Sequence, residues 1–273
     1  MARYKKILCA IDGSKSSIHA LWESFKFAAN EKCWITVTSV VPSYVGDLDM
    51  VGVGDVMGAM RKPCEDALKE AEKLAKESGV MIKTVCEEGE IFERISDLAS
   101  VENCDLIVMG RRGLRRLERA LVGSVTARVI GYSQRDVLVV PDESVVGFQH
   151  VLVATDGSRQ CRAAIDRAID FAGSYGGDIA VVSIVDVPSE FYAEAPQVVE
   201  DLVHKARGYV EDVKKKAEAS GVKAETFVRE GEAHQAIVDL AKEREVNIIV
   251  MGSHGRTGLK RLLMGSVAEK VIG

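Results

Sequence analysis

Two patterns of hydrophobic and polar positions alternate along the chain, one typical of buried strands and one of amphipathic helices. Each half opens with a short apolar run, residues 7–11 and 151–155, that leads into Asp-Gly-Ser. Such a run predicts a buried strand followed by a helix N-terminus. In the second half Ile165, Ala168 and Ala172 follow at helical spacing, which indicates one apolar stripe facing a sheet.

The same alternation continues through each half. A long helix should follow the second strand and end at Gly79 or Gly221, where a left-handed cap favours glycine. Strands that are apolar along their length and alternate with helices are typical of a parallel sheet covered on both faces. The fold class is therefore predicted to be α/β, with two tandem doubly wound, Rossmann-like domains. The further strands are predicted at 35–41, 82–86 and 106–109, with counterparts at 179–185, 224–228 and 248–251.

The two halves are an internal repeat. Residues 7–14 recur as residues 151–158. Between 105–131 and 247–273, 14 of 27 aligned positions are identical, which is more than shared composition would produce. A repeat of this length indicates duplication of a whole domain. The predicted domains are 1–145 and 146–273.

A fifth strand is predicted at 137–140, closing the first domain. The second half stops at Gly273, the counterpart of Gly131, so its fifth strand has no residues in this sequence. We expect truncation, rather than a shorter fold, to be the reason.

Composition and charge narrow the classes of partner. The chain is 47% hydrophobic and 28% charged, and it contains no apolar run near the roughly 20 residues of a membrane span. Its net charge of −5 provides no long-range attraction for nucleic acid or anionic lipid. We therefore expect a cytoplasmic protein that binds neither nucleic acid nor membranes.

The six cysteines show no metal-binding or disulfide pattern. No two of them have C-x-x-C spacing, and five fall in the first half. We expect neither a zinc site nor a disulfide framework, but ordinary reduced thiols, several of them in buried strands.

A glycine pattern recurs after the fourth strand of each half. It consists of G-x-x-G, nine residues, then Gly-Ser leading into a helix. Glycines allow backbone N–H groups to approach an anion closely, and a helix N-terminus favours phosphate. The pattern therefore predicts two anion sites. Its residues are Gly110, Gly113, Gly123 and Ser124 in the first half, and Gly252, Gly255, Gly265 and Ser266 in the second.

An aspartate ends the first strand of each half. In an open parallel sheet, ligands bind beyond the carboxyl ends of the strands, where Asp12 and Asp156 should meet the glycine loops. There each aspartate either contacts a ribose hydroxyl or a base edge, or serves only as a helix cap.

These motifs resemble the ATP-binding subclass of universal stress proteins, and the match spans essentially the whole chain, twice. Residues 252–267 are similar to the family signature almost unaltered. The first copy departs from it, with Leu114, Arg115 and Arg116 in place of Arg256, Thr257 and Gly258, although the spacing is kept. The resemblance implies an adenine nucleotide alpha hydrolase-like fold and bound ATP or AMP, with Mg²⁺ as an optional companion.

The resemblance also implies residue roles. Adenine would lie near Ala10 and Val40, or Ala154 and Ile184, and ribose near Asp12 and Gly110, or Asp156 and Gly252. Phosphates would lie on the later glycines and the Ser-Val pairs that follow them. The expected binding residues are Ala10, Asp12, Val40, Met109, Gly110, Arg112, Gly113, Gly123, Ser124 and Val125 in the first half, and Ala154, Thr155, Asp156, Ile184, Met251, Gly252, His254, Gly255, Gly265, Ser266 and Val267 in the second.

Three functions are open. The resemblance implies a nucleotide-dependent signalling or regulatory module, and a homodimer of tandem chains paired through fifth strands. A slow ATPase or autophosphorylating enzyme is the first alternative, although no G-x-x-x-x-G-K-[ST] motif and no catalytic residues are evident. A nucleotide-free structural scaffold is the second.

Three further parts of the sequence each allow two interpretations. The five arginines of the first loop, residues 111–119, lie either in solvent or an interface, or on phosphates. His254 is either a passive loop residue or a group that titrates near neutral pH. Residues 42–60 form either a mobile connection or a lid over the first site.

Overall fold

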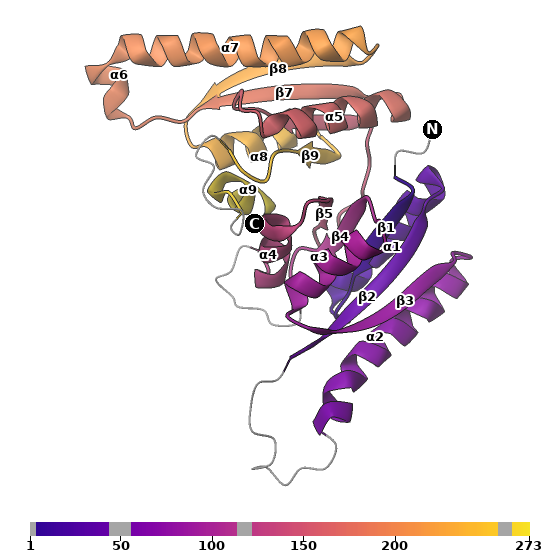
Figure 1. Ribbon diagram of the computed structural model, residues 1–273. Helices are drawn as coiled ribbons and strands as arrows, with labels where there is room; N and C mark the ends of the chain where they lie inside the picture. Colours follow the sequence, from indigo (N-terminus) through magenta and orange to yellow (C-terminus); the bar gives the residue numbers. More distant parts are fainter. Residues whose placement is uncertain (1–3, 44–55, 114–121, 256–263) are drawn as a thin grey trace. The chain divides into compact units, whose positions relative to one another are not determined.

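The apolar runs of the sequence form parallel strands in the computed structural model, which describes residues 4–43, 56–113, 122–255 and 264–273. The chain divides into two compact units. Unit 1 takes most of the chain up to Ser144, and unit 2 takes most of the chain from Val145 onward. Figure 1 labels the helices and strands of both units.

Unit 1 is a five-stranded parallel sheet with the order β3-β2-β1-β4-β5. Helices α1 and α2 contact each other and the sheet, and α3 and α4 form a second pair (Figure 1). The strands are β1 (Lys6–Ala10), β2 (Trp34–Pro42), β3 (Ile82–Gly89), β4 (Leu106–Gly110) and β5 (Asp136–Val140). The helices are α1 (Lys15–Glu31), α2 (Val56–Glu77), α3 (Ile91–Val101) and α4 (Ser124–Tyr132).

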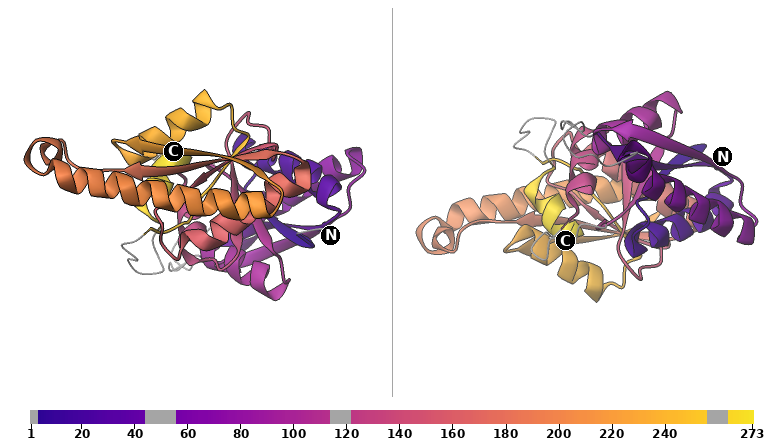
Figure 2. Two further views of the ribbon diagram at one scale, coloured as in Figure 1. Left: turned by 90° about the horizontal axis from the view of Figure 1, so that it is seen from above. Right: turned by 90° about the horizontal axis from the view of Figure 1, so that it is seen from below.

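Unit 2 repeats this plan with a four-stranded parallel sheet of order β8-β7-β6-β9. The long helix α7 lies along β7 and β8 (Figure 2). The strands are β6 (His150–Ala154), β7 (Asp178–Val185), β8 (Lys223–Glu230) and β9 (Ile248–Val250). The helices are α5 (Cys161–Tyr175), α6 (Glu190–Glu194), α7 (Pro196–Ala219), α8 (Ala233–Glu243) and α9 (Ser266–Ile272). The predicted tandem α/β fold is confirmed.

The core of each unit lies between the sheet and its helices. Because successive strand residues point to opposite faces, every second residue of the central strand joins one layer. Leu8 and Ala10 of β1 pack in one cluster with Ile95 of α3. In unit 2, Leu152 and Ala154 of β6 occupy the matching positions in a cluster with α8. The central strands are therefore buried on both sides, as their uninterrupted apolar sequence predicted.

The structure refines two predicted segments. Gly79 and Gly221 follow the long helices with φ of +67° and +75°, which confirms the left-handed caps. The interpretation of residues 42–60 as a connection or lid is wrong at its end, because α2 already begins at Val56. Residues 44–55 lie outside the described part of the chain.

The prediction that all six cysteines are reduced thiols is wrong for one pair. Cys64 of α2 and Cys86 of β3 form a disulfide, with 6.3 Å between their Cα atoms. The pair is separated by 22 positions in the sequence, so only the packing of α2 on β3 reveals it. The other four cysteines are free, and burial raises the pKa of each of them. They are Cys9, Cys33, Cys104 and Cys161.

A carboxylate at the end of α3 joins the edge of the unit 1 sheet where the strands begin. Glu102 accepts hydrogen bonds from Lys6 of β1 and from Lys83 of β3, the latter at 2.7 Å from Nζ to Oε1. These two hydrogen bonds lower the pKa of Glu102 to about 2. The carboxylate therefore stays charged well into the acid range.

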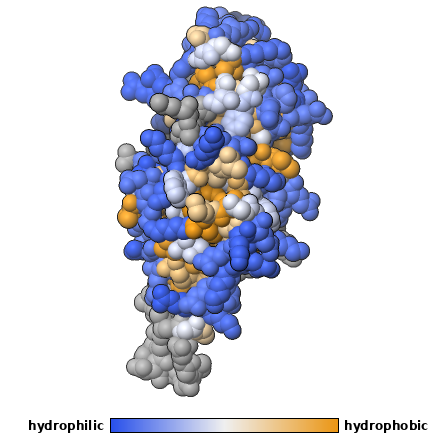
Figure 3. Space-filling model, turned by 90° about the vertical axis from the view of Figure 1, so that its right-hand side faces the viewer, coloured by the Kyte–Doolittle hydropathy of each residue, from blue (hydrophilic) through white to orange (hydrophobic). Residues whose placement is uncertain are grey.

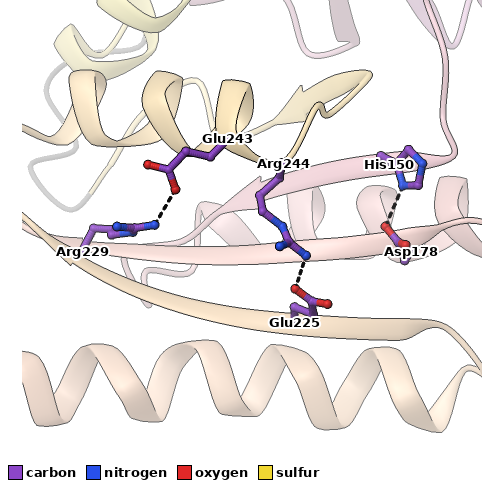
Figure 4. A network of polar contacts seen from close by, with 6 residues as sticks. All are labelled: His150, Asp178, Glu225, Arg229, Glu243 and Arg244. Carbon is purple, nitrogen blue, oxygen red and sulfur yellow. Dashed lines mark hydrogen bonds and ion pairs between the residues drawn. The ribbon is translucent and has the colours of Figure 1, made fainter.

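Unit 2 has an ion pair at the equivalent place, with the acidic and basic residues exchanged. Arg244 of α8 stands at the counterpart of Glu102 and pairs with Glu225 of β8 (Figure 4). In the same view, the ring of His150 lies 3.1 Å from a carboxylate oxygen of Asp178 and links β6 to β7. Because an ion pair works with either orientation of its charges, the two copies keep the contact and differ in its chemistry.

The surface is largely polar where it is displayed. Figure 3 shows one face of the molecule, on which hydrophilic residues separate the hydrophobic areas. Among the residues that the structure describes, no helix has both the length and the apolar character needed to cross a membrane.

Replacing Glu102 by Gln should destabilise unit 1 at neutral pH and remove part of its acid sensitivity. The lowered pKa means that the carboxylate stabilises the fold above its ordinary pKa of 4.5 and loses this contribution as the pH falls towards about 2. The thermal midpoint, followed by circular dichroism, should differ most from wild type above about pH 5 and converge near about pH 2.

The matched control is Glu65→Gln, which removes an exposed carboxylate of the same unit that lies 4.0 Å from Arg61. Exposed pairs of this kind contribute little, so its midpoint should follow that of wild type at every pH. A difference for Glu102→Gln that stays constant with pH would contradict the prediction.

Candidate functional site

The Asp-Gly-Ser turn after β1 forms one wall of the candidate site in unit 1. Asp12 Oδ1 accepts a hydrogen bond from the Ser14 backbone N–H at 3.0 Å, and Gly13 has a φ of +79°. Ser14, not Asp12, is the N-cap of α1, because its side chain accepts from the Ser17 N–H. The alternative in which Asp12 is merely a helix cap is therefore wrong, since the carboxylate shapes the turn before the helix.

Unit 2 builds the same turn after β6. Asp156 Oδ1 accepts from the Ser158 N–H at 2.9 Å, and Gly157 has a φ of +75°. The Cys161 thiol also donates to this oxygen, at 3.1 Å. Helix α5 begins after Gln160, so Asp156 is not a helix cap either.

The loop after the fourth strand passes directly over each aspartate. A Cβ on Gly113 would overlap Asp12 Oδ2, and a Cβ on Gly255 would lie 3.2 Å from Asp156 Oδ2. Glycine is therefore needed at the second position of G-x-x-G, because a side chain would displace the carboxylate. The structure thus brings together the aspartate and the glycine loop that the sequence placed about 100 residues apart.

The first glycine of the loop is held even more tightly in unit 1. A Cβ on Gly110 would lie 2.7 Å from the carbonyl carbon of Ser16 in α1. The equivalent Gly252 is less crowded, with 3.1 Å to the His254 carbonyl oxygen. The end of β4 is therefore pressed against the first turn of α1.

The Gly-Ser motif closes back onto the same loop in both units. The Gly123 N–H donates to the Arg111 carbonyl at 2.9 Å, and the Gly265 N–H donates to the Ser253 carbonyl at 2.8 Å. Gly123 precedes α4 without a side chain to cap it. Because the first N–H groups of a helix have no partner within the helix, this end of α4 suits an anion.

An exposed ion pair joins the helix that follows the Gly-Ser motif to the helix before it. Arg128 of α4 lies 3.2 Å from Glu90, which precedes α3. Lys270 of α9 lies 2.9 Å from Glu232 at the equivalent place in unit 2. Both copies therefore keep a contact between these two helices.

Both loops contain side-chain nitrogens that are buried without a hydrogen-bond partner within the described residues. They are Nε of Arg111 and Nε of Arg112 in the first loop, and Nε2 of His254 in the second; Arg112 and His254 stand at equivalent positions of the two copies. His254 is oriented by its other ring nitrogen, which lies 3.0 Å from Ser253 Oγ. A buried polar atom without a partner is costly, and a bound acceptor at this position would satisfy it.

The apolar residues expected around adenine lie at the same edge of the sheet. Ala10 and Met109 belong to the unit 1 core cluster, and Val40 and Val125 pack against it. Thr155 of unit 2 is buried, and its Oγ1 accepts from the Gly157 N–H at 3.2 Å. The remaining apolar positions of unit 2 also join one cluster, and they are Ala154, Ile184, Met251 and Val267.

Sequence reasoning missed some residues that shape this edge. Ser14 and Ser158 donate to the two aspartates, and Thr126 Oγ1 donates to the Gly110 carbonyl at 3.1 Å. The repetition of Asp-Gly-Ser in both halves was a signal for the serines. Arg115, Arg116 and Arg119 of the arginine-rich loop lie outside the described residues.

Comparison with known proteins identifies the family of the chain. The model of the Universal stress protein family matches residues 3–141 and again residues 147–273. The chain belongs to the universal stress protein family. A universal stress protein of Mycolicibacterium smegmatis matches across both halves, with 24% identity over 283 residues that cover 97% of this chain and 92% of the relative.

Other universal stress proteins match one half or share the fold. MJ0531 of Methanocaldococcus jannaschii is 36% identical over 131 residues, which are 46% of this chain and 76% of the relative. The crystal structure of a universal stress protein from Archaeoglobus fulgidus has a TM-score of 0.74 at 22% identity, covering 98% of this chain and 92% of that one. The latter likeness concerns the fold alone.

In this universal stress protein, Gly110→Ala should destabilise unit 1 more than Gly252→Ala destabilises unit 2. The methyl group at 110 meets the backbone of α1, whereas the one at 252 has a little more room. Overpacking of this kind costs about 1–3 kcal/mol. Urea unfolding of the two variants, followed by circular dichroism, measures the difference. Equal losses of unfolding free energy would show that the contact with Ser16 is relaxed in solution.

Proposed function

We propose that this universal stress protein binds an adenine nucleotide, ATP or AMP, in each unit and acts as a nucleotide-dependent signalling or regulatory module. The observation that carries the proposal is the repeated approach of a glycine loop to an aspartate, Gly113 to Asp12 and Gly255 to Asp156. A structural scaffold would have no need to keep this crowded arrangement in both copies.

Each side of the site suits one part of a nucleotide. The carboxylates of Asp12 and Asp156 are suitable acceptors for ribose hydroxyl groups. The N-terminal end of α4, with Gly123 before it, suits phosphate because the helix dipole and unpaired N–H groups favour negative charge. The apolar edge around Val40 and Ile184 suits the flat face of adenine.

The two sites should differ in how they hold phosphate. Arg112 gives the first site a permanent cation with several donors, whereas His254 gives the second a ring nitrogen. Arg112 would offer its buried Nε, and His254 its buried Nε2, to a phosphate oxygen. We assign these residues to binding and no residue to catalysis, and Mg²⁺ would accompany the phosphates.

We also propose that tandem chains form a cytoplasmic homodimer. Strand β5 is an edge of the unit 1 sheet, and Val137, Leu138 and Val139 on it are only half-buried. An unpaired apolar edge favours addition of another strand. Size-exclusion chromatography with light scattering measures the mass of the assembly.

Purified chain, denatured and analysed by chromatography, should release about two adenine nucleotides when saturated. Gly113→Val should reduce this to about one, because the new side chain displaces Asp12. Gly255→Val should do the same in unit 2, and the double variant should release none. Millimolar ATP should raise the thermal midpoint of each single variant less than that of wild type, since binding stabilises the folded state.

The matched control is Gly208→Val in α7, where a Cβ would meet nothing within 4 Å. It should release as much nucleotide as wild type. Absence of nucleotide from wild type, together with no thermal shift on adding ATP or AMP, would contradict the proposal.

A further inference from the structure

The Cys64–Cys86 disulfide is present in one copy of a duplicated fold. The equivalent positions of unit 2 hold Ala206 of α7 and Val228 of β8, which cannot be bridged. The surrounding geometry is otherwise the same, because Cys86 pairs in register with Ser39 and Val228 pairs with Ser183. Unit 2 therefore shows how the same fold is built without the disulfide.

One end of the bridge leads to the aspartate turn. Cys64 lies three residues before Ala67, on the same face of α2. A Cβ on Gly13 would contact Ala67 Cβ at 3.8 Å, so this part of α2 packs on the turn that carries Asp12. In unit 2 the ring of Tyr209 fills the equivalent place and lies against Gly157.

The other end leads to the anion-binding helix. Cys86 lies on β3, which ends at Gly89 and is followed by Glu90. Glu90 and Arg128 of α4 form an exposed ion pair at 3.2 Å. The disulfide therefore fixes α2 relative to β3 at a place from which short paths lead to both walls of the unit 1 site.

The two cysteines differ in their exposure to solvent. Cys64 is buried, whereas Cys86 is half-buried on β3, an edge strand of the sheet. Cys64 Sγ also lies 3.4 Å from the Ser39 carbonyl oxygen, which can accept a hydrogen bond from the thiol after reduction. A reagent can therefore reach Cys86, and the buried partner has an acceptor ready in its reduced form.

We propose that the Cys64–Cys86 pair is a reversible redox site that sets the nucleotide affinity of unit 1 and leaves unit 2 unaffected. The inference rests on the proposed function for its effect on binding. The reductant is a thiol, either a small molecule or a dithiol protein. In the disulfide form α2 and β3 are held together and the site is pre-organised, which lowers the cost of binding.

Thiol–disulfide exchange accounts for all atoms and electrons. A thiolate attacks Cys86 Sγ, forms a mixed disulfide and releases Cys64 as a thiolate, which takes up a proton. A second thiolate attacks the reagent's sulfur in the mixed disulfide, forms the oxidised reagent and releases Cys86, which is also protonated. Two electrons pass from the reagent to the cysteine pair, and the reverse steps restore the bridge.

The other thiols are poor competitors for this exchange. Burial raises the pKa of Cys9 and Cys33 to about 12 and that of Cys104 to about 11, so they are protonated at neutral pH. Because the thiolate is the nucleophile, these residues do not readily attack the bridge.

Titration calorimetry with ATP on full-length Gly255→Val, which keeps only the unit 1 site, tests the proposal. Incubation with dithiothreitol should raise the Kd about five- to tenfold, within the usual range of coupling between sites. Alkylation under denaturing conditions should label four cysteines before reduction and six after it. The same treatment of Gly113→Val, which keeps the unit 2 site, should leave its Kd unchanged.

Two variants identify the source of the response. Cys64→Ala combined with Cys86→Val copies unit 2, and it should bind with the weaker affinity whether or not reductant is present. Cys33→Ala keeps the bridge and should respond as the parent does. Equal Kd values for oxidised and reduced protein, with reduction confirmed by alkylation, would overturn the proposal.

A second measurement does not depend on nucleotide binding. Hydrogen–deuterium exchange of the full chain should quicken on reduction at the backbone amides of α2 around Cys64 and at the Asp12 turn, and it should not change in α7. Unchanged exchange in α2 would overturn the redox inference even if neither site bound nucleotide. Faster exchange without binding would support the redox site and overturn both the proposed function and the effect on nucleotide affinity.

Discussion

The parallel pairing of the first and fourth strands, β1 with β4 in unit 1 and β6 with β9 in unit 2, is the constraint on which the rest of each unit depends. In unit 1, Ala10 pairs with Met109, and in unit 2, Val153 pairs with Val250. Because the paired strands run in the same direction, the turn after one and the loop after the other must leave the sheet at the same edge. There the aspartate and the glycine loop lie in close contact. Glycine at the second position of G-x-x-G allows the loop to lie against the carboxylate.

This constraint explains why some positions of the duplicated chain are the same and others have diverged. The contact between Gly113 and Asp12 is steric, because a Cβ at position 113 would overlap the aspartate carboxylate. Any residue other than glycine would therefore displace the carboxylate. The contact between Glu102 and Lys83 is electrostatic, and exchanging the two signs, as Arg244 and Glu225 do, preserves it. The contact between aspartate and glycine at the carboxyl edge is thus kept residue by residue, whereas this ion pair at the opposite edge is kept only as a pair.

Much of the fold and of the site could be predicted from sequence because their signals are local and repeated. Apolar runs define the strands, and Asp-Gly-Ser and G-x-x-G mark the turns where those strands end. The contact of Gly110 with Ser16 and the disulfide of Cys64 could not be predicted in this way. Each joins residues on different elements whose packing, and not their spacing, brings them together.

The bridge and the ring at the aspartate turn are two solutions to one packing problem. In each unit a long helix lies against the Asp-Gly-Ser turn, whose glycine has positive φ. This turn must be rigid if the aspartate carboxylate is to keep its position. In unit 2 the ring of Tyr209 fills the space above Gly157, so packing alone can hold the helix there. In unit 1 the small Ala67 stands at that position, and even a Cβ added to Gly13 would lie 3.8 Å from its methyl group. A small side chain gives the turn less support, and the disulfide of Cys64 lies one helical turn away on the same helix; under the redox proposal, this covalent link takes the place of the packing that Tyr209 provides in unit 2.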